Sequence, residues 1–325
     1  MADTTDQMRE AALPAPLATA AASKAALARL LAKIEAEAQQ PETAALLDEA
    51  LHHQRAHVLG VTGPPGVGKS TLTDALIRAY RARGLSVGVI AIDPSSRRSG
   101  GALLGDRTRM ARDPADTGVF VRSMAARDRL GGIAELTFPA VVVMGAIMDR
   151  LIVETVGVGQ SETEIRATAD TVLFCAQPGA GDTLQAMKAG VLEIPDIVAV
   201  TKADLGGLAR QTVADLKSAF ALLEGHAGQQ VAVLSLSAQD GAGIGDLVER
   251  LEGRAGAPTP AALAAARTRQ ARDWVALSLS AAFGRYGLAA FQADSPAGAD
   301  GAAPFAKGSA FAERLKSILL QRNIG

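Results

Sequence analysis

The middle of the chain alternates between short apolar runs and segments with helical periodicity. Six runs are candidate strands, and most are continuously apolar rather than alternating: Val58–Thr62, Val87–Asp93, Leu151–Thr155, Val172–Ala176, Ile197–Thr201 and Val231–Leu236. Helical segments lie between them: Ser70–Arg83, Glu162–Ala169, Thr212–Leu223 and Ile244–Arg254. Continuously apolar strands are typical of a parallel sheet whose two faces are both covered by helices. The pattern predicts an α/β domain with a doubly wound, mostly parallel sheet.

The two ends of the chain carry only helical patterns. Up to about Ser23 the sequence is rich in Ala, Pro and Thr without an apolar period, and we expect a mobile segment there. Apolar residues then recur at helical spacing over 27–34 and 46–51, which predicts two amphipathic helices. After a linker at 256–260, helices are expected at about Ala261–Gly284 and Ser309–Arg322. The chain thus divides into an N-terminal helical extension (1–56), the α/β domain (57–255) and a C-terminal helical segment (256–325).

Composition narrows the class of protein. Of the 325 residues, 48% are hydrophobic and 21% charged, which excludes disorder as the main state. Lys and Arg total 33 against 34 Asp and Glu, and this balance argues against nucleic-acid or membrane-surface partners. Cys175 is the only cysteine, so the chain can form neither an intrachain disulfide nor a cysteine metal cluster. The longest apolar run, Phe138–Met148, is too short to span a bilayer. The first ten residues resemble no targeting peptide, and we expect a cytoplasmic protein.

Residues 63–70 carry a phosphate-binding motif. They read Gly-Pro-Pro-Gly-Val-Gly-Lys-Ser, a full match to GxxxxGK[ST], and they lie between a predicted strand and a predicted helix. In such a loop the main-chain N–H groups and the helix N-terminus bind phosphate oxygens, the lysine charge meets the β- and γ-phosphates, and the hydroxyl can bind Mg²⁺. The predicted nucleotide-binding residues are Gly63, Pro64, Pro65, Gly66, Val67, Gly68, Lys69, Ser70 and Thr71.

Two predicted strands end in carboxylates that suit a metal site. The first ends in Glu154, and the second ends in Asp93. Carboxylates are hard oxygen ligands of the kind that Mg²⁺ prefers, and a glutamate at the tip of a buried strand requires a partner. We therefore expect Glu154, Asp93 and Ser70 at a Mg²⁺ ion, with the N–H of Gly157 directed to the γ-phosphate.

A candidate base-reading element follows the strand near residue 200. Thr201, Lys202 and Asp204 match [NT]KxD, in which the Asp carboxylate accepts from the guanine N1–H and amino groups and the Lys stem lies along the base. The usual first residue is Asn, and Thr is the common alternative. A second segment, Ser237, Ala238 and Gln239, is placed to direct a backbone N–H to guanine O6. Together with the phosphate loop, these elements predict a GTP-binding site.

Beyond these motifs, the chain resembles the MeaB/ArgK family of P-loop GTPases, which is associated with methylmalonyl-CoA mutase. The resemblance covers roughly residues 24–254. It includes the segments at 93–96, 99–110, 154–162, 177–182 and 185–190, among them Asp-Pro-Ser-Ser, Glu-Thr-Val-Gly-Val-Gly-Gln-Ser-Glu and Gln-Pro-Gly-Ala-Gly-Asp. It implies GTP/GDP and Mg²⁺ as cofactors, Asp93 and Asp106 near the Mg²⁺ ion, and Lys69, Glu154 and Asp106 as the catalytic residues.

The resemblance also implies the partners. It indicates a homodimer built from the C-terminal helices, and a complex with methylmalonyl-CoA mutase or a related cobalamin-dependent acyl-CoA mutase. It places a mobile switch loop at 177–188 that contacts this enzyme. The residues expected to couple the two proteins are Gln177, Asp182, Gln185 and Lys188. The same residues also fit an exposed helix start at which Asp182 acts as a cap.

Two points depart from a simple GTPase pattern. Pro139 and three successive valines make the segment 136–148 a poor helix former, which leaves the boundary of the family's helix there open. No Gln directly follows Gly157, so no obvious residue orients the attacking water. We therefore expect slow, Mg²⁺-dependent GTP hydrolysis that a partner stimulates.

The favoured function is that of a mutase-associated GTPase that protects the mutase or gates its cofactor, and two other functions remain as alternatives. A metal-delivery GTPase for nickel enzymes shares the fold, but such proteins usually carry Cys or His clusters, and this chain has one cysteine and four scattered histidines. A small-molecule kinase, the label of an amino-acid transport kinase, should prefer ATP, and Asp204 argues against that.

Overall fold

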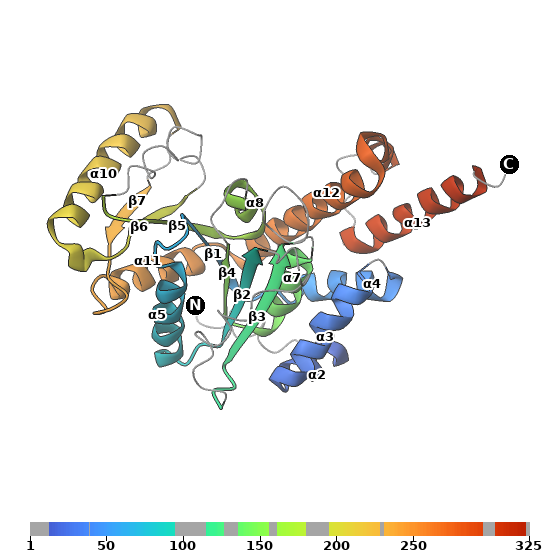
Figure 1. Ribbon diagram of the computed structural model, residues 1–325. Helices are drawn as coiled ribbons and strands as arrows, with labels where there is room; N and C mark the ends of the chain where they lie inside the picture. Colours follow the sequence, from blue (N-terminus) through green and yellow to red (C-terminus); the bar gives the residue numbers. More distant parts are fainter. Residues whose placement is uncertain are drawn as a thin grey trace. The chain divides into compact units, whose positions relative to one another are not determined.

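The structure is a computed structural model that describes residues 13–38, 40–94, 115–126, 136–155, 161–179, 195–227, 231–294 and 303–322. The chain forms two compact units (Figure 1). An α/β unit comprises residues 56–137 and 148–258, and a helical unit comprises residues 1–55, 138–147 and 259–325. The N-terminal and C-terminal segments, which the sequence pattern predicts as separate parts, thus belong to one unit.

Within the described residues, the α/β unit contains a seven-stranded sheet in the order β3-β2-β4-β1-β5-β6-β7. The strands are β1 (His57–Thr62), β2 (Val87–Pro94), β3 (Val119–Ala126), β4 (Arg150–Glu154), β5 (Thr171–Ala176), β6 (Ile197–Val200) and β7 (Ala232–Ser235). Every described pair of neighbouring strands is parallel. The predicted doubly wound, parallel α/β fold is therefore confirmed, and β1, which leads into the phosphate loop, lies in the middle of the sheet.

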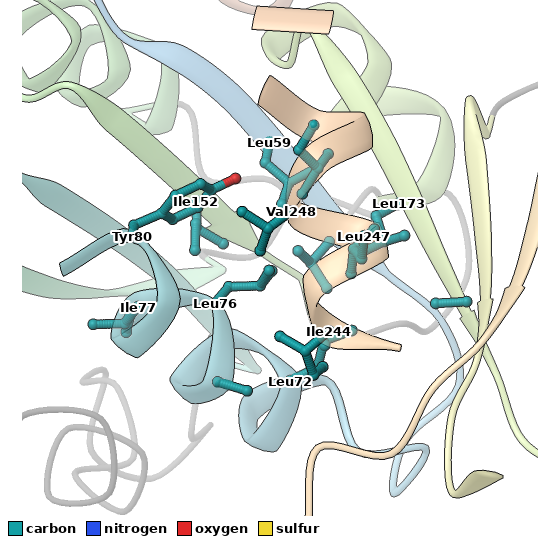
Figure 2. Packing of buried hydrophobic residues seen from close by; sticks show 14 of the residues in the cluster. Leu59, Leu72, Leu76, Ile77, Tyr80, Ile152, Leu173, Ile244, Leu247 and Val248 are labelled. Atoms are coloured by element: carbon teal, nitrogen blue, oxygen red, sulfur yellow. The ribbon is translucent and has the colours of Figure 1, made fainter. Parts of the chain in front are cut away.

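One face of the sheet is covered by α5 (Lys69–Ala82) and α11 (Ile244–Gly256). Figure 2 shows apolar residues of α5 and α11 in contact with each other and with residues of the strands that the two helices cover. The labelled residues of this cluster are Leu59, Leu72, Leu76, Ile77, Tyr80, Ile152, Leu173, Ile244, Leu247 and Val248. All are at most 8% exposed, so this cluster forms a major part of the core of the α/β unit and holds the start of α5 against the sheet.

The other face carries α8 (Ser161–Thr168) and α10 (Gly207–Ala227). Leu216 and Phe220 of α10 pack on Phe174 of β5. Helix α8 lies directly on β1, because a Cβ atom on Gly60 would come within 2.6 Å of the buried Ile165 side chain. Only glycine at this position lets the helix approach the strand so closely.

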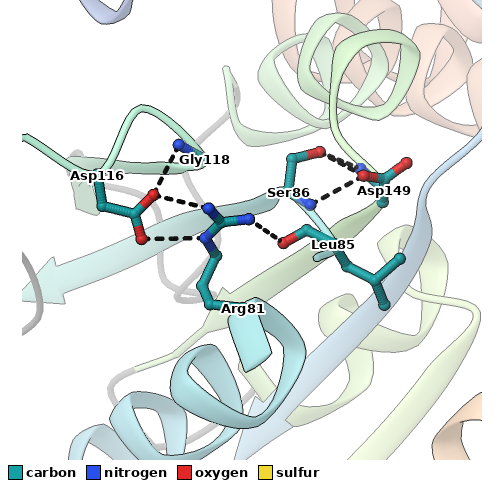
Figure 3. A network of polar contacts seen from close by, with 6 residues as sticks. All are labelled: Arg81, Leu85, Ser86, Asp116, Gly118 and Asp149. Atoms are coloured by element: carbon teal, nitrogen blue, oxygen red, sulfur yellow. Dashed lines mark hydrogen bonds and ion pairs between the residues drawn. The ribbon is translucent and has the colours of Figure 1, made fainter. Parts of the chain in front are cut away.

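The strand β3 has no counterpart among the predicted strands. It pairs with β2 alone, from Val119 to Ala126, and Arg122 and Ser123 interrupt its apolar residues. Figure 3 shows a polar network near its start: Arg81 of α5 donates two hydrogen bonds to Asp116, at 3.0 and 2.8 Å, and a third to the Leu85 carbonyl. This network ties the end of α5 to the segments that lead into β2 and β3.

The helical unit contains α2 (Ala15–Ala21), α3 (Lys24–Ala36), α4 (Pro41–Leu51), α7 (Thr137–Ile147, from Phe138 on), α12 (Pro260–Asp294) and α13 (Pro304–Arg322). The expectation of a mobile segment up to Ser23 is wrong for residues 15–21. Leu17 and Ala20 of α2 are buried, so a short apolar contact orders a segment that shows no periodicity. Ser23 instead caps α3 by accepting from the Ala26 N–H at 3.2 Å.

The segment that starts at Thr137 is a helix in spite of Pro139 and its three valines. Pro139 lies in the first turn, where an N–H group has no partner within the helix. The residues from Phe138 to Ile147 are buried, so packing outweighs their low helix propensity. The Gln54 side chain and the Arg55 N–H also bond to carbonyls of α7, at 2.7 and 3.0 Å.

Residues from distant parts of the sequence meet in the helical unit. The rings of Phe138, Trp274 and Phe305 lie 5.4–6.4 Å apart between centroids. Asp48 of α4 accepts from the N–H groups of Phe305 and Ala306, at 3.0 and 2.8 Å, and so caps the N-terminus of α13. These contacts join α4, α7, α12 and α13.

Gly284 interrupts α12 with φ 68° and ψ −173°, at the position where the sequence predicts a helix end. The helical assignment resumes beyond it and runs to Asp294. None of the helices that the structure describes combines the length and apolarity required to cross a membrane.

Candidate functional site

The phosphate loop connects β1 to α5 at the carboxyl edge of the sheet. Gly63, Gly66 and Gly68 have φ values of 138°, 73° and 103°, in the region that favours glycine. A Cβ on Gly63 would lie 2.3 Å from the carbonyl oxygen of Cys175 on β5. The loop therefore rests directly on the neighbouring strand, and a side chain at position 63 would lift it away.

Lys69 holds its charge inside this loop. Its Nζ donates to the carbonyl oxygens of Gly63 and Pro64, at 2.7 and 3.0 Å, and the residue is 8% exposed. Gly68, the residue before α5, offers no side-chain cap, so the first N–H groups of the helix are open to an anionic ligand. A buried ammonium group beside uncapped N–H groups is the arrangement that a polyphosphate requires.

Glu154 ends β4, next to β1, and its carboxylate faces α5. Ser70 Oγ donates to Oε1 at 2.6 Å, and Thr73 Oγ1 donates to Oε2 at 2.9 Å. The residue is 6% exposed. The structure thus brings together Ser70 and Glu154, two of the predicted metal ligands, and their oxygen atoms have the chemistry that Mg²⁺ prefers.

Asp93 lies near the end of β2, two residues after Ala91, which pairs with Glu154. Its backbone therefore reaches the same edge of the sheet as the phosphate loop. The other residues expected near the phosphates and at the partner, Asp106, Gly157, Asp182, Gln185 and Lys188, lie outside the described residues. Their assignments stay predictions.

The base-reading element follows β6 and is tied to the phosphate loop by two side chains. The hydroxyl of Thr201 lies 2.7 Å from the carbonyl oxygen of Val67. Lys202 adopts a left-handed conformation, with φ 53°, and its Nζ donates to the Gly66 carbonyl at 3.2 Å and to Gln177 Oε1 at 3.1 Å. These bonds fix the Lys stem across the loop.

The remaining contacts leave the base-reading groups open to a ligand. Asp204 is exposed, while the N–H of Ala203 beside it donates to the Leu236 carbonyl at 3.1 Å. In the turn after β7, the Ser237 N–H donates to Ala242 at 2.9 Å, and no described residue accepts from the Ala238 N–H. Gln239 is exposed. At this edge of the sheet the described residues thus present an exposed carboxylate and an N–H donor to which they supply no acceptor.

Sequence reasoning missed two features of the site. Thr73 shares the Glu154 carboxylate with Ser70, and the i, i+3 spacing of the two residues on a helix is a signal that could have revealed it. Thr155 Oγ1 donates to Thr62 Oγ1 at 3.1 Å across β1 and β4. In the part of the chain that the structure describes, no three His, Cys, Asp or Glu residues are grouped as a metal centre.

Comparisons with known proteins identify relatives of this chain. The family described as "Methylmalonyl Co-A mutase-associated GTPase MeaB" matches residues 27–283. A putative GTPase of Pyrococcus horikoshii is 56% identical over 153 residues, which cover 47% of this chain and 48% of that protein. The mouse protein named "Methylmalonic aciduria type A homolog, mitochondrial" is 38% identical over 194 residues, 58% of this chain and 46% of that protein.

A solved structure shares the fold. The crystal structure of an LAO/AO transport system kinase matches with a TM-score of 0.62 at 24% identity, over 94% of this chain and 98% of that chain. The chain spans about half the length of the first curated relatives that it matches.

The thiol of Cys175 provides a test of how tightly the core between the sheet, α5 and α11 is packed. Burial raises the pKa of Cys175 to about 12, an effect that the nearby Lys69 charge only partly offsets. The folded protein therefore keeps the thiol protonated. The stability that depends on this group is complete below the unfolded pKa of about 8.5 and is lost as the pH rises toward 12.

We expect iodoacetamide at pH 8 to leave native Cys175 unmodified and to alkylate it fully in guanidinium chloride, as measured by mass spectrometry. The control is a Cys175→Ser, Gly245→Cys variant, whose exposed thiol on α11 should react in the native state. Rapid alkylation of native Cys175 would show that α5 and α11 do not seal this face of the sheet.

Proposed function

Because the chain belongs to the family of methylmalonyl-CoA mutase-associated GTPases, we propose that it hydrolyses GTP to protect a cobalamin-dependent acyl-CoA mutase or to gate that enzyme's cofactor. One observation carries the GTPase part of this proposal. The phosphate loop with Lys69, the carboxylate of Glu154 and the element that contains Asp204 all lie at the carboxyl edge of one parallel sheet. The family description supports the mutase as the partner.

The position of each residue at this edge of the sheet suggests which part of GTP it binds, or whether it binds the Mg²⁺ ion. The loop N–H groups and Lys69 bind the β- and γ-phosphates, and Asp204 accepts from the guanine N1–H and amino groups. Ser70 and Glu154 hold a Mg²⁺ ion, with Asp93 and Asp106 as proposed further ligands. When bound, Mg²⁺ supplies positive charge that offsets the charge developing on the phosphate oxygens.

A kinase function is the second candidate, because the solved structure that shares the fold is named a kinase. That likeness, at 24% identity, concerns the fold. A kinase of this type would bind ATP, whereas the exposed carboxylate of Asp204 matches guanine donors that adenine lacks. We therefore place GTP hydrolysis first.

Contacts of Gln177 support a switch segment at 177–188. Gln177 directly follows β5, and its Oε1 accepts from Lys202 of the base-reading element at 3.1 Å. The Gly179 N–H donates to Thr212 of α10 at 3.2 Å. The segment therefore starts from groups that contact the nucleotide site, and we propose that Asp182, Gln185 and Lys188 carry its state to the mutase.

Exposed apolar residues on α12 and α13 support a homodimer. Trp274, Leu279 and Phe311, apolar residues of these two helices, pack inside the helical unit. Leu277, Ile318 and Leu319 are 50–62% exposed and lie on the same two helices. We propose that a second copy covers these residues and that the dimer acts in the cytoplasm.

Replacement of Asp204 tests the base assignment. Asp204→Asn removes an acceptor for two guanine donors, so we expect GTP affinity to fall by at least about 2 kcal/mol and xanthosine triphosphate to bind better than in the parent. Titration calorimetry measures both. Asp215→Asn, an exposed change on α10, is the control and should leave affinity unchanged. Equal affinity of the parent protein for ATP and GTP would contradict the assignment.

Lys188 tests the coupling to the mutase. Lys188→Ala should leave GTP binding and basal hydrolysis nearly intact, while the stimulation of hydrolysis by methylmalonyl-CoA mutase should fall about fivefold or more. Phosphate release with and without the mutase measures this, and Lys217→Ala on the exposed side of α10 is the matched control. Full stimulation of the Lys188 variant would rule out a coupling role for this residue.

Light scattering tests the dimer. The full chain should scatter as a dimer at micromolar concentration, and an Ile318→Asp, Leu319→Asp variant should scatter as a monomer, because burial of two carboxylates in an apolar interface is unfavourable. Leu208→Asp, an exposed apolar residue of the α/β unit, should stay dimeric. A monomeric parent protein would refute the proposal.

A further inference from the structure

The hydroxyl of Thr201 is hydrogen-bonded to main-chain carbonyl oxygens. The residue is 4% exposed, and its Oγ1 lies 2.7 Å from the Val67 carbonyl oxygen and 3.1 Å from the Ala176 carbonyl oxygen. The Ala176 oxygen also accepts from the Thr201 N–H at 2.9 Å. Both neighbours of the hydroxyl are therefore acceptors, on the phosphate loop and on the end of β5.

A hydroxyl group has one proton, whereas the carboxamide of an asparagine has two. The Thr201 proton is directed to a main-chain carbonyl, so the side chain keeps no donor for a ligand. Position 7 of guanine is a nitrogen that only accepts, and it can be read only by a donor. An asparagine at the start of the [NT]KxD element could bond to the loop with one group and still offer an N–H to the base.

The ammonium of Lys202 is held on other acceptors. Two of its three N–H groups donate to the Gly66 carbonyl and to Gln177 Oε1, which keep it on the phosphate loop and at the end of β5. Among the described residues of the two base-reading segments, the groups left open to the base are the Asp204 carboxylate and the Ala238 N–H. These match N1–H, the amino group and O6, which all lie on the pyrimidine ring.

We propose that Thr201 makes this site indifferent to guanine N7, so that the protein recognises guanine by its pyrimidine edge and accepts 7-deazaguanine nucleotides as readily as guanine nucleotides. The hydroxyl of Thr201 serves instead as a clamp between the loop and β6. This inference rests on the proposed GTP-binding function and adds the part of the base that determines specificity.

Paired titrations of the full chain test this inference. Dissociation constants for GDP and 7-deaza-GDP, which differ by one atom and are not hydrolysed, should agree within about twofold, because a lost hydrogen bond to N7 would separate them by about two- to tenfold. A ratio of twofold or more in the parent protein overturns the proposal. ADP is included, since GDP binding no tighter than ADP would overturn the base assignment and this inference with it.

Two variants assign the effect to residue 201. Thr201→Val keeps the shape and removes the hydroxyl, so it should weaken both diphosphates by the same factor and leave their ratio near one. Thr201→Asn adds an N–H donor, so it should open a gap of about three- to tenfold in favour of GDP. Because each result is a ratio within one protein, a general loss of stability cancels. An unchanged ratio in the Asn variant, or a changed ratio in the Val variant, overturns the role of Thr201.

Discussion

The close contact between the phosphate loop and β5 is the constraint on which the rest of the site depends. Gly63 approaches the Cys175 carbonyl so closely that no side chain fits between them. The loop is held from a second direction by Thr201, which bonds to Val67, and from a third by Lys202, which bonds to Gly66. The loop conformation is therefore set by neighbouring strands as much as by its own glycines, and these bonds tie the loop to Thr201 and Lys202 after β6.

The sequence predicts those parts of the fold in which residues next to one another along the chain are all buried to a similar degree. The strands next to β1 are buried on both faces, and their continuous apolar runs reveal them. The edge strand β3 has one neighbour and contains Arg122 and Ser123, so its pattern is weaker. Helix α7 is not evident because residues far away in the sequence, such as Trp274 and Phe305, help to bury it. Helix α2 packs on α3, the next helix along the chain, but it is too short to show an apolar period.

The candidate site divides in the same way. The phosphate loop and the base-reading element are contiguous motifs, so the sequence alone predicts roles for residues such as Lys69 and Asp204. The bonds between motifs cannot, because they depend on strand order and register. Lys202 meets Gln177 because β5 and β6 are neighbours, and Ser70 meets Glu154 because β4 lies beside β1. The hydrogen bond that the Thr201 hydroxyl donates to the Val67 carbonyl of the loop is likewise evident only in the folded sheet.

The cap that Asp48 provides to α13 has a consequence for the order of folding during synthesis. Asp48 bonds to residues 257 and 258 positions later, and α7 joins the same unit from the middle of the chain. The helical unit therefore cannot be completed until the last helix has left the ribosome. The strands of the sheet, which all precede residue 236, are available much earlier. Until α13 emerges, the face of α4 that packs on α13 has no final partner, so a nascent chain whose sheet is already complete still exposes that face.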